Sequence, residues 1–310
     1  MGRIKPILAM ALVGTAGAAA AESVRMTGLF PAEERDVAML RSIAVERFAG
    51  RDGAALAIAL ERALLIRGPD GRPHFDVVPI GRRGDPGSAE GVISGAVSTD
   101  VSQNEFDKTE RRCVEKDGPM CKKYEDARVI CQRRVIDFRV DVRVADLASQ
   151  RILYSADRQK RDEISWCEGQ QPSRGVEEAV RGMIGATASE LARAFAPRFE
   201  SYSIRFREGT KGMPKEVEKR FKAVVKQTQR DLPGACREWE AIDGEAPNHP
   251  SVLFDLGLCA EAAGDYPKAA ELYARAAPLM GRGNEGEVGA QRVAGLIAAK
   301  ADAAERAERR

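Results

Sequence analysis

The amino-acid sequence predicts an α/β (α+β) sandwich with a mixed sheet and a long antiparallel hairpin, followed by an all-α helical repeat domain. Three observations carry this prediction: a strand–helix–strand pattern over residues 41–80, apolar and charged residues in alternation over 136–144, and a helical last third with an internal repeat. Of the 310 residues, about 290 would remain after removal of an export signal, a length that suits two domains. The expected organisation is a signal peptide at 1–21, an α/β domain at 22–208, a linker at 209–214 and a helical domain at 215–310.

The N-terminus has the pattern of a cleavable export signal. Arg3 and Lys5 precede a short apolar run, and a stretch of small residues ends at Ala21. The alternative is a membrane anchor, but the run is shorter than the roughly 20 apolar residues that span a bilayer. No cysteine follows the run where a lipid could be attached. We expect cleavage near Ala21, no membrane span, and a periplasmic protein that reaches the outer membrane only through partners.

Charge and composition argue against a nucleic-acid partner. The signal would remove Arg3 and Lys5 from the 49 Lys and Arg residues, which leaves 47 against 47 Asp and Glu. A neutral chain lacks the field that drives binding to phosphate backbones. Aromatic residues make up only 5% of the sequence, too few for platforms that stack bases.

Six cysteines, none of them in the signal, favour disulfides in an exported protein. None forms a C-x-x-C pair, and His74 and His249 are the only histidines, so the sequence offers little for a metal site. Metal ligation and free thiols are the alternatives to disulfides.

The first half of the α/β domain reads as a β-α-β unit. Residues 22–40 show no strand pattern and suggest only a short helix. Ile43 and Val45 alternate with polar or small residues in a strand, 54–66 form an Ala/Leu-rich helix, and 74–80 form a second strand. Such a crossover implies parallel neighbours. A third strand is expected at 91–98, and 99–127 is expected to be a polar, cysteine-bearing insertion.

The clearest local signal is a long antiparallel hairpin. Ile136, Phe138, Val140, Val142 and Val144 alternate with charged residues, which is typical of a strand with one wet face, and a second strand continues from residue 152. If Val144 faces Ile152, then Cys131 lies opposite about Ser165, so a bulge or slight register shift would bring Cys131 to Cys167. Cys113–Cys121 would then close the insertion. The sequence alone leaves the pairing open.

The end of this domain and the linker follow. Residues 176–199 form an amphipathic helix with apolar residues on one stripe, and Tyr202, Ile204 and Phe206 form a closing strand. The Gly- and Pro-containing run 209–214 is typical of a linker.

The last third has the spacing of a tetratricopeptide (TPR) repeat. Gly257 and Ala269 would let two helices approach closely, Gly264 would make the turn, and Tyr273 would fill the gap to a neighbour. About 34 residues upstream, Ala235 and Trp239 take the positions of Ala269 and Tyr273. The upstream unit at 216–249 is degenerate in its first helix, and residues from 285 onward form a capping helix.

The repeat register yields a third disulfide and a partner-binding groove. Cys236 and Cys259 lie on helices that pack together in such repeats, and a bridge between them would brace a short array. The groove-facing positions are Arg220, Val224, Gln227, Phe254, Leu258 and Glu261.

The order of elements over about 37–207 resembles the domain shared by the curli secretion protein CsgG, the TolB amino-terminal domain and the penicillin-binding-protein activator LpoB. The resemblance rests on the run Ser42-Ile43-Ala44-Val45-Glu46-Arg47-Phe48-Ala49-Gly50, on Phe75-Asp76-Val77-Val78-Pro79 and on Gly91-Val92-Ile93-Ser94-Gly95-Ala96-Val97, followed by the hairpin. It implies an α/β sandwich used in envelope assembly. The charged outward face of the hairpin departs from a membrane pore, whose strands need apolar residues there.

Motifs of catalysis are missing from the sequence. The Gly-rich loop at 81–87 lacks the G-K-[ST] ending of a phosphate loop, and no G-x-S-x-G or H-E-x-x-H occurs. We therefore expect no catalytic residue, no metal and no cofactor. The expected function is a non-catalytic periplasmic scaffold that binds protein or peptide partners through both domains. An oligomeric ring or collar subunit, and a small-ligand carrier or enzyme with a pocket in the α/β domain, are the alternatives.

Overall fold

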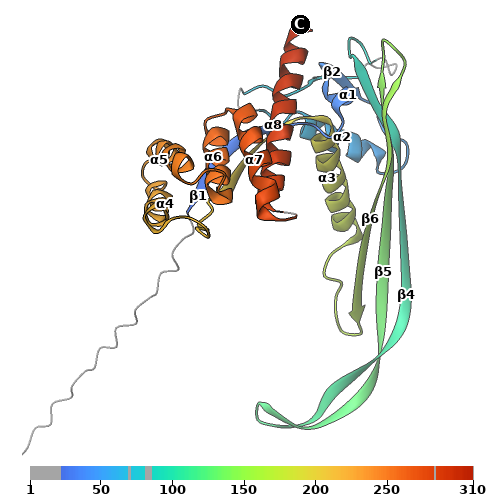
Figure 1. Cartoon of the computed structure of the whole chain (residues 1–310). Helices are drawn as coiled ribbons and strands as arrows, with labels where there is room; N and C mark the ends of the chain where they lie inside the picture. The colour runs from blue at the N-terminus through green and yellow to red at the C-terminus, as the bar shows by residue number, and fades with distance from the viewer. Residues whose placement is uncertain (1–21, 69–70, 81–85, 283, 310) are drawn as a thin grey trace, which may run out of the picture. The chain divides into compact units, whose positions relative to one another are not determined.

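The computed structural model describes residues 22–68, 71–80, 86–282 and 284–309, and the expected signal peptide lies outside these residues (Figure 1). The described chain divides into two compact units. The sheet unit comprises residues 27–200 together with 295–309, and the helical unit comprises 22–26 together with 201–294. The expected domains were 22–208 and 215–310. In this division the N-terminal segment 22–26 belongs to the helical unit and the C-terminal segment 295–309 belongs to the sheet unit.

The sheet unit begins with the expected β-α-β crossover. Strand β2 (Ser42–Val45) leads into helix α2 (Gly53–Leu64) and then into strand β3 (Asp76–Val78). Strand β2 pairs in parallel with β3 on one side and with β4 (Gly91–Asp117) on the other. The parallel pairing follows from the helical crossover, which returns the chain in the same direction.

Two long antiparallel pairings complete a mixed five-stranded sheet in the order β3-β2-β4-β5-β6. Strand β5 (Met120–Asp146) runs antiparallel to β4, and β6 (Ile152–Cys167) runs antiparallel to β5. The predicted hairpin is therefore present as β5–β6. Its register differs from the expected one, because Val144 faces Tyr154 and a bulge follows before Ala145 faces Ile152. This shift of two residues brings Cys131 opposite Cys167.

One face of the sheet packs against helices. Ile43, Ile93, Phe138 and Val140 are buried in one cluster with side chains of α2 and of α3 (Val176–Phe195), the predicted amphipathic helix. The opposite face of β5 carries Arg139, Asp141 and Arg143, which are exposed. The alternation in the sequence thus predicted correctly which face is wet.

Two corrections concern strands that were not predicted. The polar segment 99–127, expected as an insertion, continues β4 and begins β5, so both strands are 27 residues long. Residues 22–40 contain the strand β1 (Ser23–Phe30) as well as the short helix α1 (Arg35–Ala38). The segment 99–117 is largely exposed on both faces and shows no alternation. Strand β1 does alternate, with Val24 and Met26 buried between exposed neighbours, and this pattern was missed.

The expected closing strand also pairs differently. Strand β7 (Arg198–Arg205) covers most of the predicted segment, but it forms a separate two-stranded sheet with β1 and does not join the larger sheet. Residues about 170 positions apart meet in this sheet, and local sequence patterns carry no information about such pairing.

The helical unit contains consecutive helices with short connections: α4 (Lys215–Gln227), α5 (Leu232–Glu245), α6 (Pro250–Ala262), α7 (Tyr266–Met280) and the first part of α8 (Glu285–Glu308). Each of the helices α4 to α7 packs against the next one in the sequence (Figure 1). A Cβ atom added at Gly257 would lie 2.7 Å from Tyr273, so this glycine does allow the close approach expected of it. Gly264 turns the chain with φ +77°.

Among the described helices, none is long and apolar enough to cross a bilayer.

Candidate functional site

The candidate site is the outer part of the β4–β5 hairpin, residues 107–130, which we call the arm. Strand β6 ends at Cys167, opposite Cys131, so only β4 and β5 continue beyond that point. Figure 1 shows this two-stranded ribbon extending past the ends of β6 and α3. The ribbon turns at Gly118 and Pro119, where Asp117 faces Met120 and Gly118 adopts φ +59°.

Contacts along the arm are polar and exposed. Asp107 pairs with Arg128 across the strands, and the Arg111 guanidinium lies 4.8 Å from the centroid of the Tyr124 ring. The guanidinium of Arg128 holds the pKa of the Asp107 carboxyl below its usual range. Exposed ion pairs contribute about 0–1 kcal/mol each, and a two-stranded hairpin alone is marginal in water. The arm therefore needs covalent support.

Two disulfides supply that support. Cys131–Cys167 fastens the base of the arm to the last residue of β6, and Cys113–Cys121 joins the strands close to the turn. A third disulfide, Cys236–Cys259, links α5 to α6 in the helical unit. These are the three pairs named from the sequence, and all six cysteines are used. Disulfides of this number are consistent with a protein outside the cytoplasm.

The arm exposes apolar side chains and backbone. Val114, Met120, Tyr124 and Ile130 are each at least half exposed. Strand β4 also has an open edge, because the last described residue that pairs on its β2 side is Ala96. Natural proteins seldom leave a long edge and apolar residues exposed together unless a partner covers them.

The sequence held a signal for the arm that alternation does not show. Gly118-Pro119 is a Gly-Pro dipeptide, which marks a turn, and Cys113 and Cys121 lie on either side of it. Taken together, these residues predict a stapled hairpin in place of a loop.

The six expected groove residues fall into two groups. Val224, Phe254, Leu258 and Glu261 are buried in the helical unit, whereas Arg220 and Gln227 are partly exposed. Arg220 forms an ion pair with Glu245 at 2.7 Å, and Gln227 donates to Asp231. The six side chains therefore do not line one open surface in this structure.

Strand β7 and the segment after it occupy part of that face. The Tyr202 hydroxyl donates to Glu261 at 2.8 Å, and the Arg207 amide donates to Asp255 at 2.8 Å. Phe206 packs 5.1 Å from the Trp239 ring. Burial raises the pKa of the Asp255 carboxyl well above its ordinary value.

Glu261 is the best satisfied buried charge in the helical unit. Arg292 of α8 donates two hydrogen bonds to its carboxylate, each 2.7 Å long, and Tyr273 donates a third at 2.6 Å. A buried carboxylate with this many donors ties α6, α7, α8 and β7 together. Its position indicates a structural role.

The two histidines have structural positions as well. His74 donates from Nε2 to the Ala38 carbonyl oxygen at 2.8 Å, and burial with the nearby Arg306 charge lowers its pKa to about 4. His249 caps α6 by accepting from the Ser251 amide, and burial lowers its pKa. Within the described part of the chain, no three His, Cys, Asp or Glu residues cluster as metal ligands.

Comparison with known proteins gave distant structural neighbours only. No family model and no curated protein matches the chain. Among solved structures, a single-residue variant of the PelC dodecamer and the PelC dodecamer itself, both from Paraburkholderia phytofirmans, are similar at 18% and 17% identity. They cover 56% and 54% of this chain and 98% and 96% of their own, with TM-scores of 0.26 and 0.27.

Proposed function

We propose that this protein is a non-catalytic scaffold of the cell envelope that docks protein partners through the arm. One observation carries the proposal: a two-stranded ribbon, stapled at base and turn, projects beyond its sheet with an open edge and exposed apolar residues. Such a ribbon costs stability to maintain unless it has a partner.

A location in the periplasm is part of the same proposal. The N-terminal charge and small-residue pattern is that of an export signal, and three disulfides suit an oxidising compartment. The resemblance of 37–207 to the CsgG, TolB amino-terminal and LpoB domain, and of the helical unit to TPR repeats, fits a binding role in the envelope.

The partner would dock by adding a strand to the open edge of β4. Main-chain hydrogen bonds would supply affinity, and Val114 near the turn would contact apolar side chains of the added strand. Binding of a peptide in the helical groove would be a second way to hold a partner. It would require the hydrogen bond from Tyr202 of β7 to Glu261 to break.

A shortened arm tests the proposal. Phe106 and Cys131 face each other, so Asn-Gly can replace residues 107–130 and close the hairpin with a two-residue turn while keeping Cys131–Cys167. We expect this variant to fold with the same melting profile and to lose partners captured by crosslinking in intact envelopes. Retention of every captured partner by the shortened variant would contradict the proposal.

Two variants distinguish specific partner binding by the arm from non-specific binding by exposed apolar residues. One variant changes the arm residues Val114, Met120 and Tyr124 to Ser, and the other changes Ile58 and Val288, which are similarly exposed, to Ser. Capture should fall only in the first.

A ring or collar subunit is the second candidate. Strand β6 is a 16-residue edge strand, and one copy could add its own edge to another. Sedimentation across a range of concentrations distinguishes the two, because the scaffold proposal does not need self-association and the ring does.

A further inference from the structure

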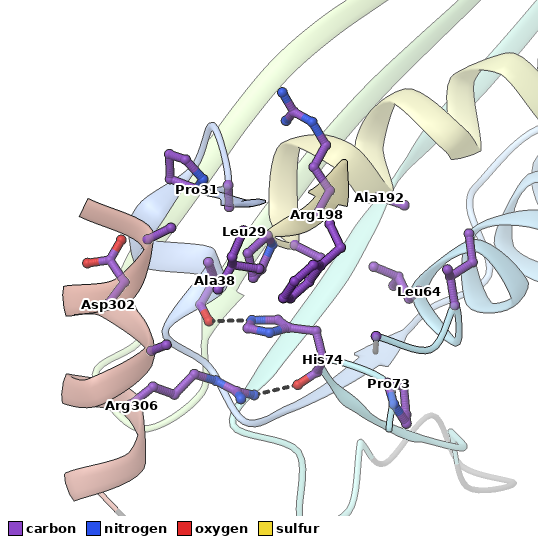
Figure 2. Close-up of a pocket in the computed structure, with 18 of the residues that line it drawn as sticks. Leu29, Pro31, Ala38, Leu64, Pro73, His74, Ala192, Arg198, Asp302 and Arg306 are labelled. Carbon is purple, nitrogen blue, oxygen red and sulfur yellow. Dashed lines mark hydrogen bonds between the residues drawn. The ribbon is translucent and has the colours of Figure 1, made fainter. Parts of the chain in front are cut away.

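The sheet unit contains a large cavity that the scaffold role does not use. Its volume is about 1340 Å³, above the roughly 300–1,000 Å³ of most ligand pockets. Its walls come from the ends of β1, from α1, from the end of α2 and the segment before β3, from the end of α3, and from the last turns of α8 (Figure 2).

The inner wall is apolar. Ala38, Leu64 and Ala299 line it and are almost fully buried, and His74 lies among them with its ring held to the Ala38 carbonyl (Figure 2). Apolar side chains also continue outward to the rim, where Ile66 is 72% exposed and Phe199 is 53% exposed. An apolar wall that runs from a buried floor to an exposed rim suits an extended hydrocarbon chain better than a compact polar metabolite.

The lining carries more positive than negative charge, although Arg41 is paired with Glu90 and Arg198 with Glu200. Two aspartates, Asp76 and Asp302, face six arginines: Arg41, Arg67, Arg72, Arg193, Arg198 and Arg306. Asp302 is already paired with Arg35 at 2.6 Å. Arg67 and Arg193 are exposed and line the cavity. Arg67 donates to the Gly71 carbonyl oxygen at 2.7 Å, a neutral acceptor that leaves the guanidinium charge uncompensated by that contact. A cationic rim over an apolar floor complements a ligand with an anionic head and an apolar tail.

The Arg306 side chain fixes one wall of the cavity through hydrogen bonds. It donates to the Leu40 carbonyl at 3.1 Å and to the His74 carbonyl at 2.6 Å, so α8 is fastened to the segments around α1 and β3. Arg35 of α1 also pairs with Asp302 and Glu305 of α8. These contacts hold the last turns of α8 as one wall of the cavity.

We propose that this cavity binds a single-chain anionic amphiphile, with the acyl chain against Ala38, Leu64 and Ala299 and the anionic head at Arg67 and Arg193. The proposal is independent of docking through the arm. The head can be a carboxylate or a phosphate, because guanidinium groups pair with either.

Calorimetric titration of the full chain tests the proposal with four probes: dodecanoate, dodecyl phosphate, dodecyltrimethylammonium and inorganic phosphate. We expect at least one of the anionic amphiphiles to bind, the cationic one to bind at least about tenfold more weakly, and phosphate alone not to compete. Shortening the tail from dodecanoate to decanoate should weaken binding severalfold, up to about fourfold for each methylene removed. Binding of neither anionic amphiphile at about 1 mM, or equal binding of the cationic one, would overturn the proposal.

Two matched pairs of variants locate the site. Ala303 lines the cavity and the adjacent, equally exposed Ala304 does not, so Ala303→Trp should weaken binding about tenfold while Ala304→Trp should not. Arg193→Glu should weaken binding of the anionic probe. Arg181→Glu, on the same helix and outside the cavity, should leave that binding unchanged. Equal losses within either pair would place the amphiphile elsewhere and refute the assignment. Loss of partner capture by the shortened arm is a different readout, so the two proposals fail separately.

Discussion

At the scale of single residues, Gly257 shows how the helical unit depends on one missing side chain. An added Cβ would lie 2.7 Å from the Tyr273 ring, and Tyr273 is itself buried and hydrogen-bonded to Glu261. The ring cannot move without disturbing that carboxylate. The glycine is therefore required by packing, although glycine inside a helix is unfavourable by itself.

We predict that Gly257→Ala destabilises the helical unit by about 1–3 kcal/mol because it overfills the α6–α7 contact. Gly244→Ala in α5 is the control, since a Cβ there meets no atom within 4 Å. Urea unfolding followed by Trp239 fluorescence in a Trp166→Phe background measures both. Equal stability of the two variants would mean that α6 and α7 do not approach closely.

His74 gives the sheet unit a dependence on pH. Its pKa is lowered to about 4, below the value of about 6.5 in an unfolded chain, so the unfolded state binds a proton first as pH falls. The stability that His74 confers is complete above pH 6.5 and is lost progressively as pH falls towards 4.

We predict a loss of roughly 2–3 kcal/mol of sheet-unit stability between pH 6.5 and 4 from this group. His74→Gln keeps a hydrogen-bond donor for the Ala38 carbonyl. It should reduce the dependence of sheet-unit stability on pH between 6.5 and 4. Unfolding midpoints measured at several pH values provide the check, and parallel profiles for the two proteins would rule out His74 as the source.

At the scale of elements, alternation can predict only strands that have one buried face, and one of these, β1, was still missed. Alternation predicted β5 and its continuation into β6, since Phe138 and Val140 point to the core while Arg139 and Asp141 point to water. In the arm both faces meet water, so no alternation of apolar and polar residues arises. The disulfides could be named on three different grounds: strand register for Cys131–Cys167, repeat register for Cys236–Cys259 and elimination for Cys113–Cys121.

The arm's disulfides have separable effects. We predict that Cys113→Ser with Cys121→Ser increases amide hydrogen exchange across residues 107–130 while leaving the unfolding midpoint of the sheet unit unchanged. Only the arm is held by this bridge, and it contributes few buried contacts.

Removal of the base disulfide should act on the whole sheet unit. Cys131→Ala with Cys167→Ala opens a loop with a sequence separation of 36, worth about 3–4 kcal/mol in the chain-entropy model. Denaturation of both double variants measures the contrast. An unchanged midpoint for the base variant, or a lowered one for the arm variant, would contradict this division.

At the scale of the whole molecule, the sequence predicted the order of the α/β and helical parts but not how the chain ends are shared between units. Strand β1 pairs with β7, and the last turns of α8 contact Arg35 and His74. These contacts join residues that are far apart in the sequence, 267 positions apart for Arg35 and Asp302, which no local pattern reports. The groove residues stay a prediction. In this structure four of them are buried, and the Tyr202 hydroxyl of β7 donates to Glu261.

The scaffold proposal depends on partner contact at the arm, and photocrosslinking in living cells tests this most directly. A photoreactive amino acid is placed at Val114 in the arm or at Ile58 in α2, where the native side chains are 53% and 49% exposed. We predict that the photoreactive residue at position 114 forms a discrete protein adduct, and that the same residue at position 58 does not form this adduct. Absence of any adduct from position 114, or the same adducts from both positions, would contradict a docking role for the arm.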